Sequence, residues 1–263
     1  MPPARSVDHL PMATGPGEPS TATTTRPPGA RTTGTGPTAR ARTALAARRR
    51  WVQTPLTRPT IVVLGCATVY MAAAILFVSP LEAPEYHFVH ERGAVTALSA
   101  ILLAMSSGFA LSSLLLSGGA RLETRIFWSL IAAGMAVLAV DELMELHEKI
   151  GGRLDEIDAL GIASAGALRG WNDLIVILYG VAALPFVLTF LPSVLRYPRL
   201  LELLGAAFVF FVIHTSIDSL VEPRTTISAI TEEAAKIYCA CFLALAFLST
   251  LLVIARNPGL QRG

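Results

Sequence analysis

Charged residues are scarce in this chain of 263 residues. They make up 15% of the sequence, whereas hydrophobic residues make up 53% and the mean hydropathy is +0.57. Soluble domains carry about 25% charged residues, so the composition indicates an integral membrane protein and argues against a soluble enzyme. Cysteine is also scarce, and Cys66, Cys239 and Cys241 all lie in apolar runs. An odd count without a CxxC pair argues against a disulfide framework and a thiolate zinc site.

Large apolar residues are almost absent from the first 50 residues, which are rich in Thr, Pro and Arg. Such a segment buries too little apolar surface to offset the entropy lost on folding. We therefore predict a disordered, basic cytoplasmic tail over residues 1–58. This tail carries nine arginines against two acids, a net charge of +7, whereas the rest, with 12 basic and 17 acidic residues, carries −5.

This division of charge bears on the partners of the chain. No basic stripe follows the tail, so no nucleic-acid partner is expected. The arginines at positions 48–50 lie just before the first apolar run. Basic clusters in that position bind anionic lipid head groups, so the expected partners of this protein are the bilayer and those head groups.

Six charge-poor stretches follow the tail. The hydrocarbon core of a bilayer, about 30 Å thick, needs roughly 20 helical residues to cross it. The sequence therefore predicts an all-α, six-helix transmembrane bundle over residues 59–256 and a short cytoplasmic tail over residues 257–263. The predicted spans are residues 60–79, 93–117, 126–146, 174–195, 200–221 and 227–254.

Arginine marks alternate loops between these spans. It occurs before the first span, between the second and third, between the fourth and fifth, and after the sixth. Since Arg and Lys collect on the cytoplasmic side, both termini are predicted to be cytoplasmic, and the expected location is the plasma membrane.

Ionisable side chains recur at the outer ends of three predicted spans. Residues four and seven apart share a helix face, which groups the acids of the third span. The third and fifth spans run outward and the sixth returns, so the three groups are expected at the same depth. The predicted outward-facing site comprises Asp141, Glu145, Glu148, His214, Asp218, Glu232 and Glu233.

A ring of carboxylates and imidazoles inside a helix bundle is a common way to build a metal site. Without thiolates, such a ring favours Zn, Mn or Fe. In a regular helix, His147 would point away from Asp141 and would contact a different helix or the head-group layer. Further residues that could support the site are His147, Lys236, Asp173, His87 and His90.

Three functions fit this pattern, and the sequence leaves open whether the protein is an enzyme. A divalent metal could activate water in a membrane hydrolase that acts on a lipidic or peptidic substrate. Alternatively, the ring could relay protons or cations in a transporter or sensor, with Lys236 compensating Glu232 and Glu233. In the third alternative the groups are structural: Glu232 and Lys236 form an ion pair, and Ser or Thr hydroxyl groups of adjacent helices satisfy Asp141.

The run from Asp141 to Glu148, with the acids of the fifth and sixth spans, resembles uncharacterised multi-pass bacterial membrane proteins, which implies no activity. It also has a weak resemblance to the alkaline-ceramidase-like membrane hydrolases, which place His, Asp and Ser around zinc near one membrane face. That family has seven spans and a His-x-x-x-His pair in the last span, where this chain has Glu232, Glu233 and Lys236. The resemblance therefore implies a chemistry class and assigns no residue a role.

Overall fold

A computed structural model describes residues 57–78, 82–83, 86, 93–157, 170–221 and 225–257, all within one compact unit. The predicted tails at 1–58 and 257–263 lie almost wholly outside these residues and stay predictions. His87 and His90 also lie outside the described residues. The described part of the chain is helical and contains no strand, as the predicted all-α class requires.

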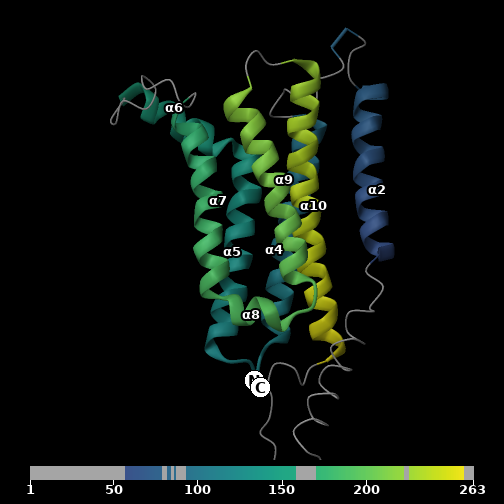
Figure 1. Ribbon diagram of the computed structural model, residues 1–263, viewed down its shortest axis with the longest axis vertical. Coiled ribbons are helices and arrows are strands. Elements are labelled where there is room, and N and C mark those ends of the chain that lie inside the picture. The colour runs from purple at the N-terminus through teal and green to yellow at the C-terminus, as the bar shows by residue number, and fades with distance from the viewer. Residues whose placement is uncertain are drawn as a thin grey trace, which may run out of the picture. The chain divides into compact units, whose positions relative to one another are not determined.

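The helices follow one another as antiparallel rods (Figure 1). Their bounds are α2 Thr57–Ala73, continued by the π-helical η1 Ala74–Val78, α4 Ala94–Leu116, α5 Leu122–Met144, α6 Leu146–Ile157, α7 Trp171–Thr189, α8 Leu191–Arg196, α9 Leu200–Leu220 and α10 Thr226–Arg256. Six of them are long and apolar enough to cross a membrane: α2 with η1, α4, α5, α7, α9 and α10. The chain is therefore consistent with an integral membrane protein, and the orientation and plasma-membrane location stay predictions.

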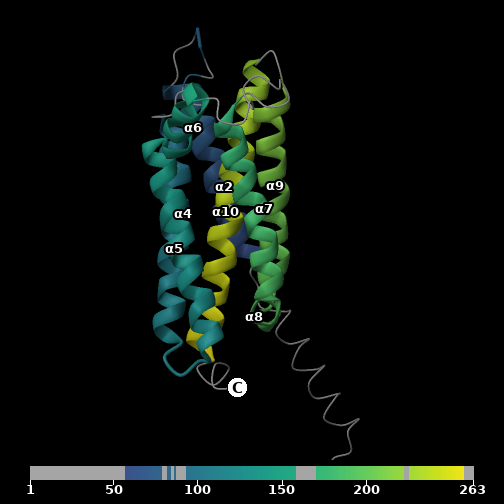
Figure 2. The same cartoon turned by 90° about the vertical axis from the view of Figure 1, so that its left-hand side faces the viewer.

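Helix α10 lies at the centre of the bundle, with α4 and α5 on one side and α7 and α9 on the other (Figure 2). It has 31 residues and is the most buried of the six helices. Its buried face carries many small residues, including Ala235, Ala240 and Ala244, which let neighbouring helices approach closely. Helices α4 and α9 pack along α10, and α5 packs along α4.

An aromatic cluster fills the end of the bundle near α8. Phe127 and Trp128 of α5 are fully buried, with their ring centroids 4.9 Å apart in an edge-to-face arrangement. Trp128 also contacts Tyr197 after α8 and Phe247 of α10 edge-on. These rings tie α5, α8 and α10 together at the end of the bundle opposite α6.

The predicted third span ends too late, because α5 stops at Met144. Glu145 adopts a left-handed conformation, with φ 54° and ψ 43°. A left-handed residue ends an α-helix, and the chain turns there into α6, which Figure 1 shows beside the start of α7. The expectation that Asp141, Glu145 and Glu148 continue one regular helical face is therefore wrong.

The predicted fourth span is also too long at its end. Helix α7 continues through Pro185 and ends at Thr189, and α8 begins two residues later as a separate helix with a proline in its first turn. Proline is favoured in the first turn because the N–H it lacks has no partner there. Figure 1 shows α8 running across the end of the bundle.

A close contact joins α6 to the start of α7. The Trp171 backbone N–H donates to Asp155 Oδ1 at 3.1 Å, so α6 supplies a hydrogen-bond acceptor to the first turn of α7. A Cβ added to Gly151 would lie 2.5 Å from the backbone nitrogen of Asn172, whereas one added to Gly152 meets nothing within 4 Å. The helices approach this closely because position 151 has no side chain.

Substitution of Gly151 therefore separates packing from helix propensity. We expect Gly151→Ala to lower the melting temperature in detergent by several degrees, since overpacking costs about 1–3 kcal/mol. Gly152→Ala should leave the melting temperature unchanged or raise it slightly, because alanine favours the helix over glycine by about 1 kcal/mol. Tryptophan fluorescence during heating measures both, and equal melting temperatures would contradict this contact.

Candidate functional site

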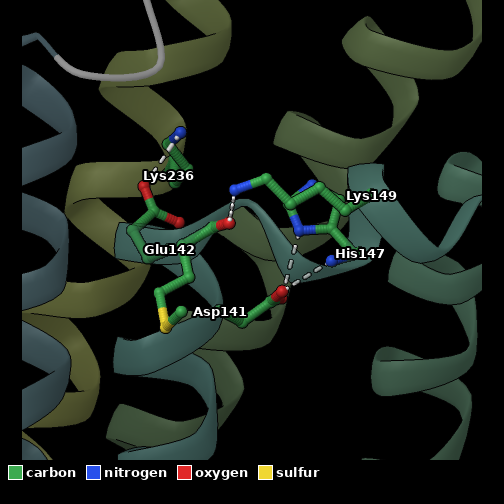
Figure 3. Close-up of polar contacts among 6 residues, drawn as sticks. Asp141, Glu142, His147, Lys149 and Lys236 are labelled. Carbon is green, nitrogen blue, oxygen red and sulfur yellow. Dashed lines mark hydrogen bonds and ion pairs between the residues drawn. The ribbon is translucent and has the colours of Figure 1, made fainter. Parts of the chain in front are cut away.

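The turn at Glu145 brings His147 back onto the end of α5 (Figure 3). His147 Nδ1 lies 3.1 Å from Asp141 Oδ2, and the His147 backbone N–H donates to Asp141 Oδ1 at 2.7 Å. The expectation that His147 points away from Asp141 is wrong, because it assumed an unbroken helix. A carboxylate that holds one imidazole nitrogen fixes the orientation of the ring.

Helix α7 reaches the same carboxylate. The Tyr179 hydroxyl lies near the Asp141 carboxylate. Asp141 is buried, and a buried carboxylate needs such donors to replace its hydration. The structural alternative expected Ser or Thr hydroxyl groups around Asp141, whereas the groups found there are His147 and the Tyr179 phenol.

A second ionic group joins α5 to α10. Lys236 Nζ lies 2.9 Å from Glu233 Oε2 and 3.1 Å from Glu142 Oε1; Figure 3 shows the contact with Glu142. All three side chains are mostly buried, with relative exposures of 18%, 11% and 14%. The acidic partners of Lys236 are therefore Glu233 and Glu142, and not Glu232, with which the structural alternative expected an ion pair.

His214 of α9 lies on the other side of α10. Its ring lies near the backbone of Glu232 and near Asp218, one turn further along α9. The ring atom Nδ1 is buried and has no hydrogen-bond partner within the described part of the chain. His214 of the predicted fifth span therefore lies beside α10, the predicted sixth span.

These groups line one end of a cavity of about 790 Å³ between the helices. We call this end the polar end. It comprises Asp141, Glu142, His147, Glu148, Asn172, Tyr179, His214, Asp218, Glu232, Glu233 and Lys236. The remaining wall is almost entirely apolar, and its larger side chains are Leu103, Met135, Leu138, Val176, Leu184, Val187, Leu188, Leu201, Leu204, Phe208, Phe211 and Leu243.

Helix α7 forms one wall of the cavity and is the least buried of the six long helices. It approaches α9 at Gly180, where an added Cβ would lie 2.3 Å from Phe211 Cε1. Helix α7 contacts α6, α8 and α9, and its contact with α5 is at most marginal. The cavity therefore lies between α5 and α7.

Residues 61–251 match the family described as Domain of unknown function (DUF8692). The chain belongs to this family. The match runs from α2 into α10 and so contains every residue of the polar end. No curated protein and no solved structure matches the chain, and the family match gives no link to the ceramidase-like hydrolases.

The structure brings most of the predicted site residues of this DUF8692 member to the polar end and leaves two away from it. Glu145 does not line the cavity, and its Oε2 lies 3.7 Å from Lys149 Nζ. Asp173 is buried in the first turn of α7, also outside the cavity lining. The predicted residues at the polar end are Asp141, Glu148, His214, Asp218, Glu232 and Glu233, with His147 and Lys236 beside them.

The predicted Zn, Mn or Fe centre receives no support. Among the residues that the structure describes, no group of three or more His, Cys, Asp and Glu side chains could hold a metal ion. Glu142 and Tyr179 belong to the polar end but were missed. Glu142 lies one residue from Asp141 and faces α10 instead, and a single tyrosine in an apolar span carries no signal in the sequence.

Removing the positive charge of Lys236 tests how much its ion pairs with Glu142 and Glu233 stabilise the protein. We expect Lys236→Met to lower the melting temperature strongly, because breaking a buried ion pair costs about 3–5 kcal/mol. Glu142→Gln and Glu233→Gln added to that variant should restore part of the loss, since they remove the uncompensated charges.

Lys149 provides the matched control. Its side chain is 55% exposed and pairs with Glu145, the residue just before α6; an exposed pair is worth at most about 1 kcal/mol. Lys149→Met should therefore change the melting temperature little. If Lys236→Met and Lys149→Met melt at the same temperature, the ionic group does not hold α5 to α10.

Proposed function

We propose that this DUF8692 member binds an amphiphile, a molecule with a hydrocarbon chain and a polar head group, within the membrane. The observation that carries the proposal is the change in the cavity lining from ionic at the polar end to apolar over the rest. Its volume of about 790 Å³ falls within the range of small-molecule sites, about 300–1,000 Å³. The head group would lie at the polar end and the chain along the apolar wall.

The apolar wall argues against an ion pathway through the whole cavity. Ions crossing a protein are coordinated by carbonyls, charged side chains or water. Below the polar end the larger lining side chains are Leu, Val, Met and Phe, which offer an ion no ligand. A hydrocarbon chain, in contrast, makes favourable dispersion contacts with them.

A purely structural role explains the Lys236 contacts but not the space beside them. Ion pairs that only stabilise a bundle are best surrounded by packed side chains, because protein interiors are close-packed. Here the carboxylates of α5, α9 and α10 border a cavity large enough for a ligand. The lipidic substrate class of the hydrolase hypothesis is compatible with this cavity without a metal.

Access from the bilayer is compatible with the helix packing. The extensive contacts of the bundle join α4, α5, α9 and α10, and α7 takes little part in them. An amphiphile that enters between α5 and α7 keeps its chain in an apolar medium throughout. Because lipid tails are as apolar as these side chains, transfer of the chain contributes little, and the head group decides selectivity.

Filling the cavity tests the proposal. Gly205 of α9 lines the cavity, and an added Cβ there meets nothing within 4 Å. We expect Gly205→Trp to lower the binding of hexadecyl-chain probes at least about tenfold, which corresponds to about 1.4 kcal/mol. The probes are hexadecylamine, hexadecanol and palmitate, added to the purified full chain in a neutral maltoside detergent and counted by native mass spectrometry.

Gly134→Trp is the matched control. Gly134 lies in α5, is exposed, does not line the cavity and also has open space at its Cβ position. Its variant should bind the probes as the wild type does. Equal probe binding by the Gly205 and Gly134 variants, with both folded, would refute binding in this cavity.

A further inference from the structure

We infer that the ligand is a bilayer lipid of which the protein encloses only the head group and the first part of one chain, while the rest of the chain passes alongside α7 into the membrane. This inference rests on the amphiphile binding proposed above and names its ligand class. It follows from where the cavity is closed and where it is open.

The cavity is closed at the polar end. Asp141 and Glu232, which line this end, are each only 5% exposed. Helix α6 contributes Glu148 to the lining and is joined to the start of α7 through the contact of Asp155 with the Trp171 backbone. A head group bound at the polar end is therefore surrounded by protein.

The cavity is also closed toward α8. Val187 of α7 and Leu204 of α9 line it, and both pack against the aromatic cluster that contains Phe127 and Trp128. The rings of this cluster fill the end of the bundle. A chain that follows the apolar wall away from the polar end therefore meets this cluster and cannot continue straight on.

Between these two ends, α7 leaves the cavity open. Residues 181–185 are all exposed, and five successive residues at about 100° each cover every side of a helix. Ala183 and Leu184 are among them and line the cavity, as does Leu188 one turn further on; Leu184 is 48% and Leu188 68% exposed. Because its cavity side and its outer side are both exposed, the space of the cavity continues around α7 to the outside of the bundle.

The other walls show that the opening lies on this side of the bundle. Leu201 and Gly205 of α9 line the cavity and are also exposed, whereas Leu103 of α4 and Ala240 of α10 line it and are buried. Helices α7 and α9 are two of those fit to cross a membrane. Lipid chains therefore surround the opening.

An opening of this kind determines which chains can bind. In an enclosed cavity, each methylene group beyond the space available forces the surrounding side chains apart, which is destabilising. Through this opening, further methylene groups pass into lipid chains that are as apolar as the cavity wall, so they cost little. Binding therefore sets no upper limit on chain length, and a second chain can stay in the bilayer.

Four alcohols that differ only in the chain test this inference on the full chain in neutral maltoside detergent. Native mass spectrometry compares octanol, hexadecanol, docosanol and hexadecanol with pyrene on its last carbon, at equal mole fractions in the micelles. We expect docosanol and the pyrene probe to bind within about threefold of hexadecanol, because their ends leave the cavity. An enclosed chain would instead make both at least about tenfold weaker.

Two neighbouring alanines of α7 locate the opening. Ala182 and Ala183 are both exposed, but only Ala183 lines the cavity. We expect Ala183→Trp to lower the binding of docosanol and the pyrene probe at least about tenfold and to affect octanol less, because its shorter chain stays nearer the polar end. Ala182→Trp, the matched control, should bind all four alcohols as the wild type does.

The outcomes separate this inference from the proposed function. If hexadecanol binds while docosanol and the pyrene probe do not, the chain is enclosed, so this inference is overturned and amphiphile binding stands. If none of the alcohols binds, both proposals fail. The series in the wild type decides this without any variant. Equal binding of docosanol by the folded Ala183 and Ala182 variants overturns the exit alongside α7.

Discussion

The contact of Lys236 with Glu142 and Glu233 is the constraint on which the rest of the bundle depends. These charges lie at one end of helices otherwise fit to cross a membrane, where hydration cannot replace a lost partner. The contact fixes the position of α5 against α10, although α5 packs mainly on α4. Once α5 is held there, Asp141 faces the space between α5 and α7, and the acids of α9 and α10 lie opposite it.

The left-handed residue at Glu145 completes this arrangement. It ends α5 and turns the chain, so that His147 meets Asp141 and α6 reaches the start of α7 through Gly151. Helix α7 is thereby held at its ends by α6 and α8 and packs on α9, with little contact to α5. A cavity persists between α7 and α5 because these two helices make little direct contact.

Much of the fold could be predicted because it depends on local properties. The length and low charge of the apolar stretches predicted all six long helices. The observed helix ends lie within a few residues of the predicted ones, except for the C-terminal end of α7. The sequence predicted a common depth for Asp141, His214 and Glu233, and the structure shows that all three line one cavity. The metal centre, in contrast, assumed a regular helix after Asp141 and side chains that converge, and the described residues contain no such group.

The sequence by itself determined the all-helical bundle, the apolar spans and the acidic surplus at one end, since these follow from composition and spacing along the chain. Only the tertiary structure decided that Glu142 shares Lys236 with Glu233, that Tyr179 reaches Asp141, and that the acids border a cavity. The physical reason is that each of these contacts joins different helices. Its geometry depends on how the helices turn and pack, which no local pattern of residues records.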